Sequence, residues 1–107
     1  EAEHLYIRAL EITEKALGSE HPDVGICLKN LALFFHNQKK YLKARPYYER
    51  AIRFTEKNKG ENSLELASLL ERYASSLNNM KNRNREATRI SNRAKGIRSK
   101  IGNETKK

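Results

Sequence analysis

The sequence predicts an all-α protein built as an α-solenoid, in which antiparallel helix pairs stack on their neighbours. Three observations support this prediction. The chain repeats with a period of 42 residues, so that Tyr6 falls on Tyr48 and Ala9 on Ala51. Apolar and small residues recur at helical spacing in five segments, and no segment alternates as a strand does. A period of this length is typical of solenoids, whose units bury their apolar faces only against neighbouring units.

The first two helices are bounded by glycine and proline. The first is expected over 1–17, and Gly18 follows it where a left-handed C-cap is usually needed. Pro22 can occupy the first turn of the second helix, expected over 22–38, because its missing N–H costs nothing there. The apolar face of the first helix is Leu5, Ala9, Ile12 and Ala16, and that of the second is Leu28, Leu31, Ala32 and Phe35.

Three further helices follow after polar turns, over 41–57, 64–80 and 84–101. Pro46 lies within or just past the first turn of the third helix, where N–H groups lack intrahelical partners anyway. The expected core positions are Ala44, Tyr48, Ala51 and Ile52, then Leu66, Leu70, Tyr73, Ala74 and Leu77, then Ala87, Ile90, Ala94, Ile97 and Ile101.

The order of small and large residues in these helices resembles the signature of a tetratricopeptide repeat. The 42-residue spacing and the segment His21-Pro22-Asp23-Val24 resemble the longer variant typified by kinesin light chains. The resemblance covers residues 1 to about 100. It implies a superhelix of about five helices, with a half repeat over 1–17, a full repeat over 22–57 and a last repeat with a capping helix over 64–101. A basic tail over 102–107 is expected to follow.

The resemblance also implies a concave groove that binds a peptide and is lined by the first helix of each pair. Asn30 and Asn37 can each donate to and accept from a peptide backbone, and Arg72 offers a planar fork for a carboxylate. Alternatively, these are solvated polar positions on an exposed face. The expected groove residues, flanking Lys29 and His36 included, are Ile26, Lys29, Asn30, Leu33, His36 and Asn37, together with Ser68, Arg72, Ser75 and Asn79.

The net charge of +9 is concentrated near the C-terminal end, since residues 81–107 carry +8 of it. Arg85, Arg89, Arg93 and Lys100 form a basic patch on the fifth helix. Such a patch suggests an alternative function, binding to a nucleic acid or to an acidic protein surface. No aromatic residue occurs after Tyr73, so a platform for stacking bases is not expected.

Several other functions are not indicated by the sequence. We find no catalytic constellation, no metal-ligand spacing among the three histidines, no cofactor motif and no apolar run of the roughly 20 residues that cross a bilayer. The single Cys27 suggests a reducing, cytoplasmic location. The chain opens on a second helix of a pair, which favours self-association through the exposed half repeat. The sequence therefore predicts a non-enzymatic scaffold that binds a protein or peptide partner.

Overall fold

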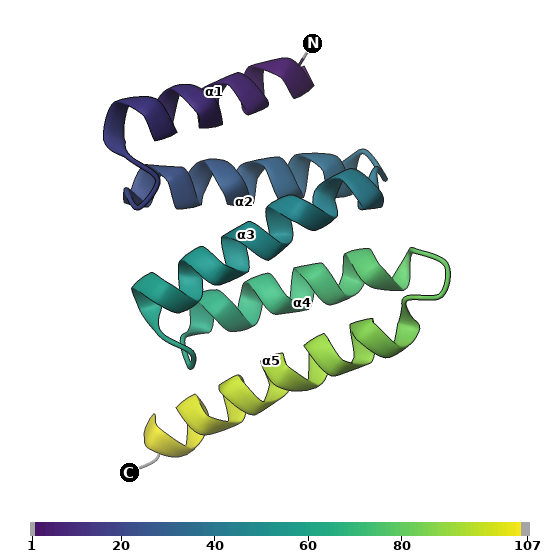
Figure 1. Cartoon of the computed structure of the whole chain (residues 1–107). Helices are drawn as coiled ribbons and strands as arrows, with labels where there is room; N and C mark the ends of the chain where they lie inside the picture. The colour runs from purple at the N-terminus through teal and green to yellow at the C-terminus, as the bar shows by residue number, and fades with distance from the viewer. Residues whose placement is uncertain (1, 106–107) are drawn as a thin grey trace. The chain divides into compact units, whose positions relative to one another are not determined.

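A computed structural model describes residues 2–105, which form helices joined by short turns (Figure 1). No strand occurs in that range, so the all-α prediction is confirmed. The helices are α1 (Ala2–Leu17), α2 (Pro22–Asn37), α3 (Tyr41–Lys59), α4 (Leu64–Asn78) and α5 (Asn84–Thr105).

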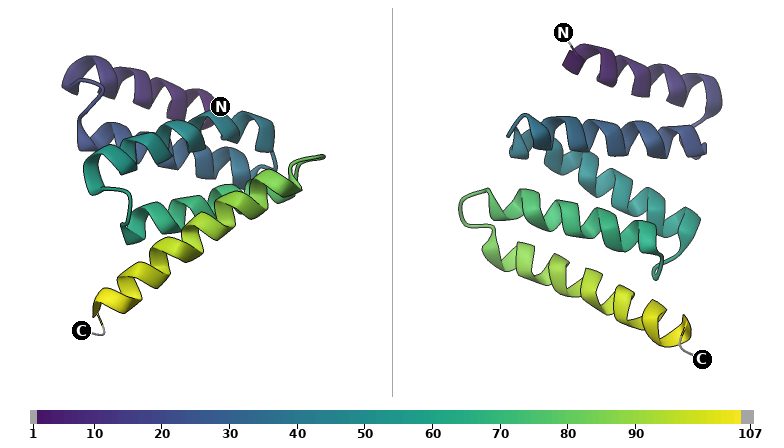
Figure 2. Two further views of the ribbon diagram at one scale, coloured as in Figure 1. Left: turned by 60° about the horizontal axis from the view of Figure 1, so that its bottom comes forward. Right: turned by 180° about the vertical axis from the view of Figure 1, so that it is seen from behind.

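The chain divides into two compact units, Glu1–Phe54 and Thr55–Lys107, with the boundary inside α3. In the first unit α1 and α2 run antiparallel, and in the second α4 and α5 do so (Figure 2). Each unit has apolar residues buried along these helices.

The core of the first unit is built on α2. Rings of α2 contact rings of both neighbouring helices: Phe34 packs on Tyr6 of α1 with centroids 4.9 Å apart, and Phe35 stacks on Tyr47 of α3 at 5.7 Å. The expected core positions of α2 and α3 are all buried, which confirms them. The buried apolar residues are Leu10, Val24, Leu28, Leu31, Ala32, Phe35, Ala44, Tyr48, Ala51 and Ile52.

Gly25 lets α2 approach α3 closely. A Cβ added at this position would lie 2.5 Å from Cε1 of Phe54, well inside van der Waals contact. In the next repeat Gly25 corresponds to Ala67, 42 residues on, and Phe54 to Ile97, 43 residues on because the last turn is one residue longer. The glycine is thus replaced by the larger alanine and the phenylalanine by the smaller isoleucine. The combined side-chain volume of the two positions is therefore similar in the two repeats, although both residues differ.

The second unit packs α4 against α5. The expected core residues of α4 are buried, as are Ala87, Ala94 and Ile97 of α5, while Ile90 and Ile101 are half-buried. The buried residues of this unit are Leu66, Ala67, Leu69, Leu70, Tyr73, Ala74, Ser76, Leu77, Ala87, Ala94 and Ile97.

The two turns that contain glycine have the same backbone geometry. Gly18 and Gly60 both adopt positive φ, +88° and +87°, and each donates its N–H to the carbonyl of the glutamate four residues earlier. Lys39 and Asn82 also share a φ of 62° in the other two turns. Left-handed backbone is easy for glycine and tolerable for asparagine, but lysine adopts it at a cost of roughly 1–2 kcal/mol.

Two features differ from the sequence expectation. The expected apolar face of α1 is exposed, with Leu5 at 69% and Ile12 at 57%, and the one buried residue of α1 is Leu10. This is because the matching residues of α3 pack on α2, whereas no described helix lies over that face of α1. At the other end α5 continues to Thr105, where a tail was expected, since Gly102 keeps a helical φ. Residues 106–107 of that expected tail lie outside the described residues.

Candidate protein-binding surfaces

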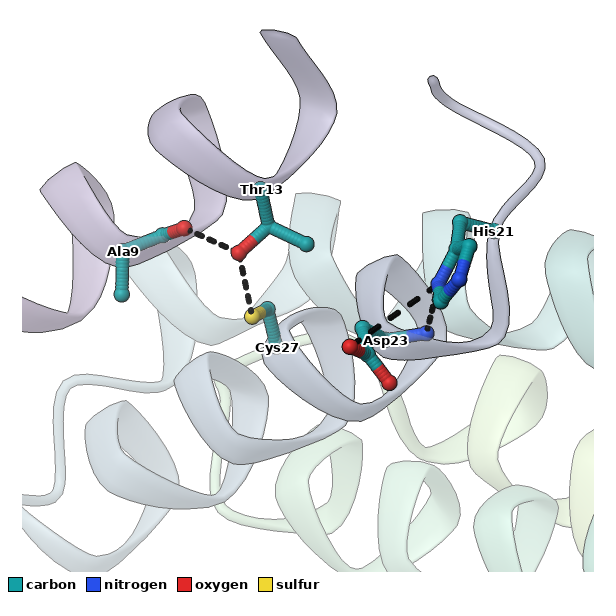
Figure 3. Close-up of polar contacts among 5 residues, drawn as sticks. All are labelled: Ala9, Thr13, His21, Asp23 and Cys27. Atoms are coloured by element: carbon teal, nitrogen blue, oxygen red, sulfur yellow. Dashed lines mark hydrogen bonds and ion pairs between the residues drawn. The ribbon is translucent and has the colours of Figure 1, made fainter. Parts of the chain in front are cut away.

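The first candidate surface belongs to α2, whose start is fixed by His21 (Figure 3). The His21 backbone is extended, with φ −70° and ψ 140°, and its Nδ1 accepts a hydrogen bond of 3.1 Å from the N–H of Asp23. Pro22 occupies the first turn, as expected. A side-chain cap of this kind satisfies one of the N–H groups that a helix start leaves unpaired.

Four residues form a continuous stripe along α2, which we call the α2 stripe: Ile26, Asn30, Leu33 and Asn37. Ile26 is 57% exposed, both asparagines are exposed, and Leu33 is half-buried. Lys29, beside the stripe, is exposed as well. The stripe alternates apolar and amide side chains, so it offers both contact area and backbone-like hydrogen bonding to a ligand.

His36, expected beside this stripe, is tied to the core instead of standing free. Its Nδ1 lies 2.6 Å from the hydroxyl of Tyr48, which is completely buried on α3. The imidazole also meets the rings of Tyr41 and Tyr48 edge-on. Sequence reasoning missed this contact because the two residues lie on different helices.

Cys27 also lies between helices (Figure 3). Its thiol donates to Oγ1 of Thr13 on α1 at 3.7 Å, and that hydroxyl donates to the carbonyl of Ala9 at 2.7 Å. Cys27 is half-buried, in keeping with a small packing residue that joins α2 to α1.

The equivalent stripe on α4, called here the α4 stripe, consists of Ser68, Arg72, Ser75 and Asn79. Ser63 caps the helix by accepting from the N–H of Leu66 at 3.1 Å. Arg72, Ser75 and Asn79 are exposed, and Ser68 is half-buried. The amide of Asn79 donates to the carbonyl of Ser75 at 2.8 Å, so its oxygen is the atom it presents to a ligand.

Arg98 of α5 modifies the edge of the α4 stripe. Its Nε and Nη2 donate to the two carboxylate oxygens of Glu71 at 2.7 and 2.9 Å, and Nη2 also lies 3.3 Å from Oγ of Ser68. This bidentate pair lowers the pKa of Glu71 and raises that of Arg98, because each charge stabilises the other. Glu71 therefore stays ionised beside the stripe, and Arg98 compensates its negative charge.

The basic patch of α5 is only partly available to a ligand. Arg93 is exposed but pairs with Glu56, at the end of α3 within the same unit. Arg85, Arg89 and Lys100 are exposed. The pair of Arg93 repeats that of Arg50 with Glu14, 3.0 Å apart in the first unit. Stepping both residues by the repeat would have revealed this pair: Glu14 maps on Glu56 at 42 residues, and Arg50 maps on Arg93 at 43 because the turn before the last helix is one residue longer.

Neither a metal centre nor a membrane span is found in the part of the chain that the structure describes. No three His, Cys, Asp or Glu side chains gather there as a metal site would require. No described helix is long and apolar enough to cross a membrane.

Comparison with known families agrees with this geometry. A family model described as tetratricopeptide repeat matches residues 1–57 and again residues 26–100. No curated protein shows significant similarity to the chain. Together the two matches cover most of the sequence, and the helices they span are those that carry both stripes. The chain therefore belongs to the tetratricopeptide repeat family.

Proposed function

We propose that the chain is a non-enzymatic scaffold with two peptide-binding surfaces for a protein partner, the α2 stripe and the α4 stripe. Tetratricopeptide repeats generally mediate protein–protein interaction, and the family is one of interaction scaffolds. We further propose that its repeats are of the 42-residue variant resembling kinesin light chains. The matching turns at Gly18 and Gly60 support that subtype.

The observation that carries the proposal is the α2 stripe itself. Ile26 exposes more than half of its apolar surface beside the exposed amide of Asn30. An apolar anchor flanked by hydrogen-bonding groups is the arrangement that specific peptide sites use, because the anchor supplies affinity and the polar groups supply register.

Polar residues of the α4 stripe support a ligand that carries an anionic group. Arg72 is exposed, and Ser68 and Ser75 lie one turn to either side of it. The neighbouring carboxylate of Glu71 is neutralised by Arg98, so it does not repel an anion. A guanidinium with adjacent hydroxyls can bind a carboxylate by charge-assisted hydrogen bonds.

A randomised peptide library selected against the whole chain provides the probe for this proposal. The selected peptide, fluorescently labelled, is titrated with the chain and with the variants Ile26→Ser and Asn30→Ala. We expect each variant to weaken binding about tenfold, as loss of about 1.4 kcal/mol does. The matched control for Ile26→Ser is Leu42→Ser, which removes an apolar side chain of α3 that is 71% exposed and lies outside both stripes. Equal effects of Ile26→Ser and Leu42→Ser would overturn the assignment of the α2 stripe.

The exposed apolar face of α1 is the surface through which we propose that two copies associate. Leu5, Ala9 and Ile12 follow one another at helical spacing, and their 42-residue counterparts Tyr47 and Phe54 each pack on α2. An antiparallel α1 of a second copy presents the same stripe. Sedimentation equilibrium should show a dimer that Leu5→Ser/Ile12→Ser abolishes and Leu42→Ser leaves intact. A chain that stays monomeric at high concentration would refute it.

The proposed location is the cytoplasm. The single Cys27 is half-buried and hydrogen-bonded through its thiol, which suits a reducing compartment.

A further inference from the structure

The solvent side of α5 has a composition unlike that of the two stripes. Arg85, Arg89 and Lys100 are exposed there, and Asn92 and Ser99 lie on the same side of the helix. Between Asn84 and Gly102 the sequence holds one carboxylate, Glu86, which is half-buried and lies 3.5 Å from Arg83. Between Asn84 and Gly102 this side of α5 therefore carries cations and hydrogen-bond donors and no carboxylate of its own.

We propose that this face of α5 binds the phosphate backbone of a double-stranded nucleic acid without reading its sequence. Arginine, lysine, serine and asparagine are the side chains that make most phosphate contacts in such complexes. Arg85 and Arg89 are one helical turn apart, about 6 Å along the axis, and a duplex carries one phosphate per about 3.4 Å of each strand. Successive cations of the row thus fall within reach of different phosphates.

The composition of the face distinguishes a nucleic acid from an acidic protein. Protein interfaces have an apolar or aromatic centre that supplies most of the affinity. Among the described residues α5 exposes no large apolar side chain: those that are exposed are Leu5, Tyr6, Ile12, Leu17, Ile26, Leu42 and Leu64. A phosphate backbone needs no such centre.

Gly96 leaves this side of α5 accessible to a large ligand. It lies on the solvent side of α5 between Arg89 and Lys100, and an added Cβ there would meet no atom within 4 Å. Glycine inside a helix costs roughly 1 kcal/mol relative to alanine. It leaves the backbone uncovered among the exposed cations, so no side chain at this position would hold a ligand away from them.

Binding of a single strand by stacking is disfavoured, because no aromatic residue follows Tyr73 and Tyr73 itself is buried. The interaction is therefore electrostatic, and its strength depends on salt. Arg85, Arg89 and Lys100 contribute three phosphate contacts, whereas Arg93 is occupied by Glu56. With three contacts the logarithm of affinity falls with the logarithm of salt at a slope of about −2.7.

The experiment titrates a labelled, mixed-sequence DNA duplex of about 20 base pairs with the full chain at 50 and 200 mM salt. We expect affinity to drop about 40-fold between these salts. The variant Arg85→Gln/Arg89→Gln/Lys100→Gln should bind only residually. Its matched control is Arg8→Gln/Lys15→Gln/Arg53→Gln, which removes two arginines and one lysine from exposed positions of α1 and α3. This control should keep most of the affinity.

A second variant tests the proposal by gain of function. Glu56→Gln releases Arg93, so binding should tighten at 50 mM salt and the slope should steepen to about −3.6. Glu14→Gln makes the same change of charge one repeat earlier and releases Arg50, so it should leave the slope unchanged. Absence of duplex binding at 50 mM salt, equal loss in both triple variants, or tighter binding of labelled polyglutamate than of duplex would each overturn the proposal.

Discussion

The carboxylate of Glu14 on α1 accepts a hydrogen bond of 3.0 Å from the guanidinium of Arg50 on α3. One repeat later Glu56 and Arg93 form the equivalent pair within the second unit. In both pairs the acid lies near the C-terminal end of its helix, α1 or α3. The arginine lies two helices further along the chain, on α3 or α5. The ion pair thus recurs with the repeat.

Breaking the first pair should lower stability only modestly. Both side chains are partly exposed, at 31% for Glu14 and 40% for Arg50, so water screens their attraction. Glu14→Gln should reduce the free energy of unfolding in urea by at most about 1 kcal/mol, and by less in 1 M salt. The exposed Glu11→Gln is the comparison, and an equal effect there would show that the pair contributes nothing specific.

Gly25 and Phe54 should behave as one packing unit. Gly25→Ala places a Cβ against the Phe54 ring and should lower the free energy of unfolding by about 1–3 kcal/mol. Adding Phe54→Ile, which copies the Ala67 and Ile97 combination of the next repeat, should recover about 1 kcal/mol of that loss. A double-mutant cycle in urea measures the coupling free energy between the two substitutions. Strictly additive effects would contradict the idea that a smaller residue at position 54 makes room for a larger one at position 25.

The hydroxyl of Tyr48 should contribute more than that of Tyr47. Tyr48→Phe removes the partner of His36 at a fully buried position and should cost about 1 kcal/mol. Tyr47→Phe keeps the ring that stacks on Phe35, at a half-buried position, and should change stability by less than about 0.5 kcal/mol. Thermal unfolding of both variants gives the comparison, and the reverse order would rule out a stabilising hydrogen bond to His36.

Stability should fall in acid. Hydrogen bonds from Lys43 and Lys40 lower the pKa of Glu3 below its ordinary 4.5, and Arg98 does the same for Glu71. A carboxyl whose folded pKa is depressed stabilises the fold above its unfolded pKa. That contribution is lost as pH falls from about 4.5 through the lower folded value. Urea titrations at pH 7, 5 and 3 should show a smaller acid loss in Glu3→Gln/Glu71→Gln, and an unchanged loss would exclude these two groups as its source.

The fold could be predicted from the sequence because the helical spacing of apolar residues and the repeat period indicate the same helices. Tyr48 and Ala51 are expected in the core from spacing alone, and both are buried. The repeat period also places Gly60 at the end of α3, where the helix stops. Spacing within a helix identifies the buried face well because burial is periodic.

Contacts between helices could not be predicted in the same way. Arg98 was expected only as one charge of a basic segment, yet it binds Glu71 on α4. Leu5 and Ile12 form a regular apolar face, but periodicity does not show whether a neighbouring helix covers it. The exposure of Asn30 and Arg72 agrees with the groove stripe, while their binding role stays a prediction.

The exposed face of α1 has a consequence for how the first unit opens. α1 buries Leu10 alone, whereas α2 buries five side chains. Segments with few buried contacts unfold locally before the rest of a domain, and their amide hydrogens exchange sooner. We therefore expect the backbone amides of α1 to lose protection first, while those around Leu31 and Ala32 exchange only when the whole unit unfolds. Covering Leu5 and Ile12 would then slow exchange throughout α1, a signature by which an occupant of this face can be recognised.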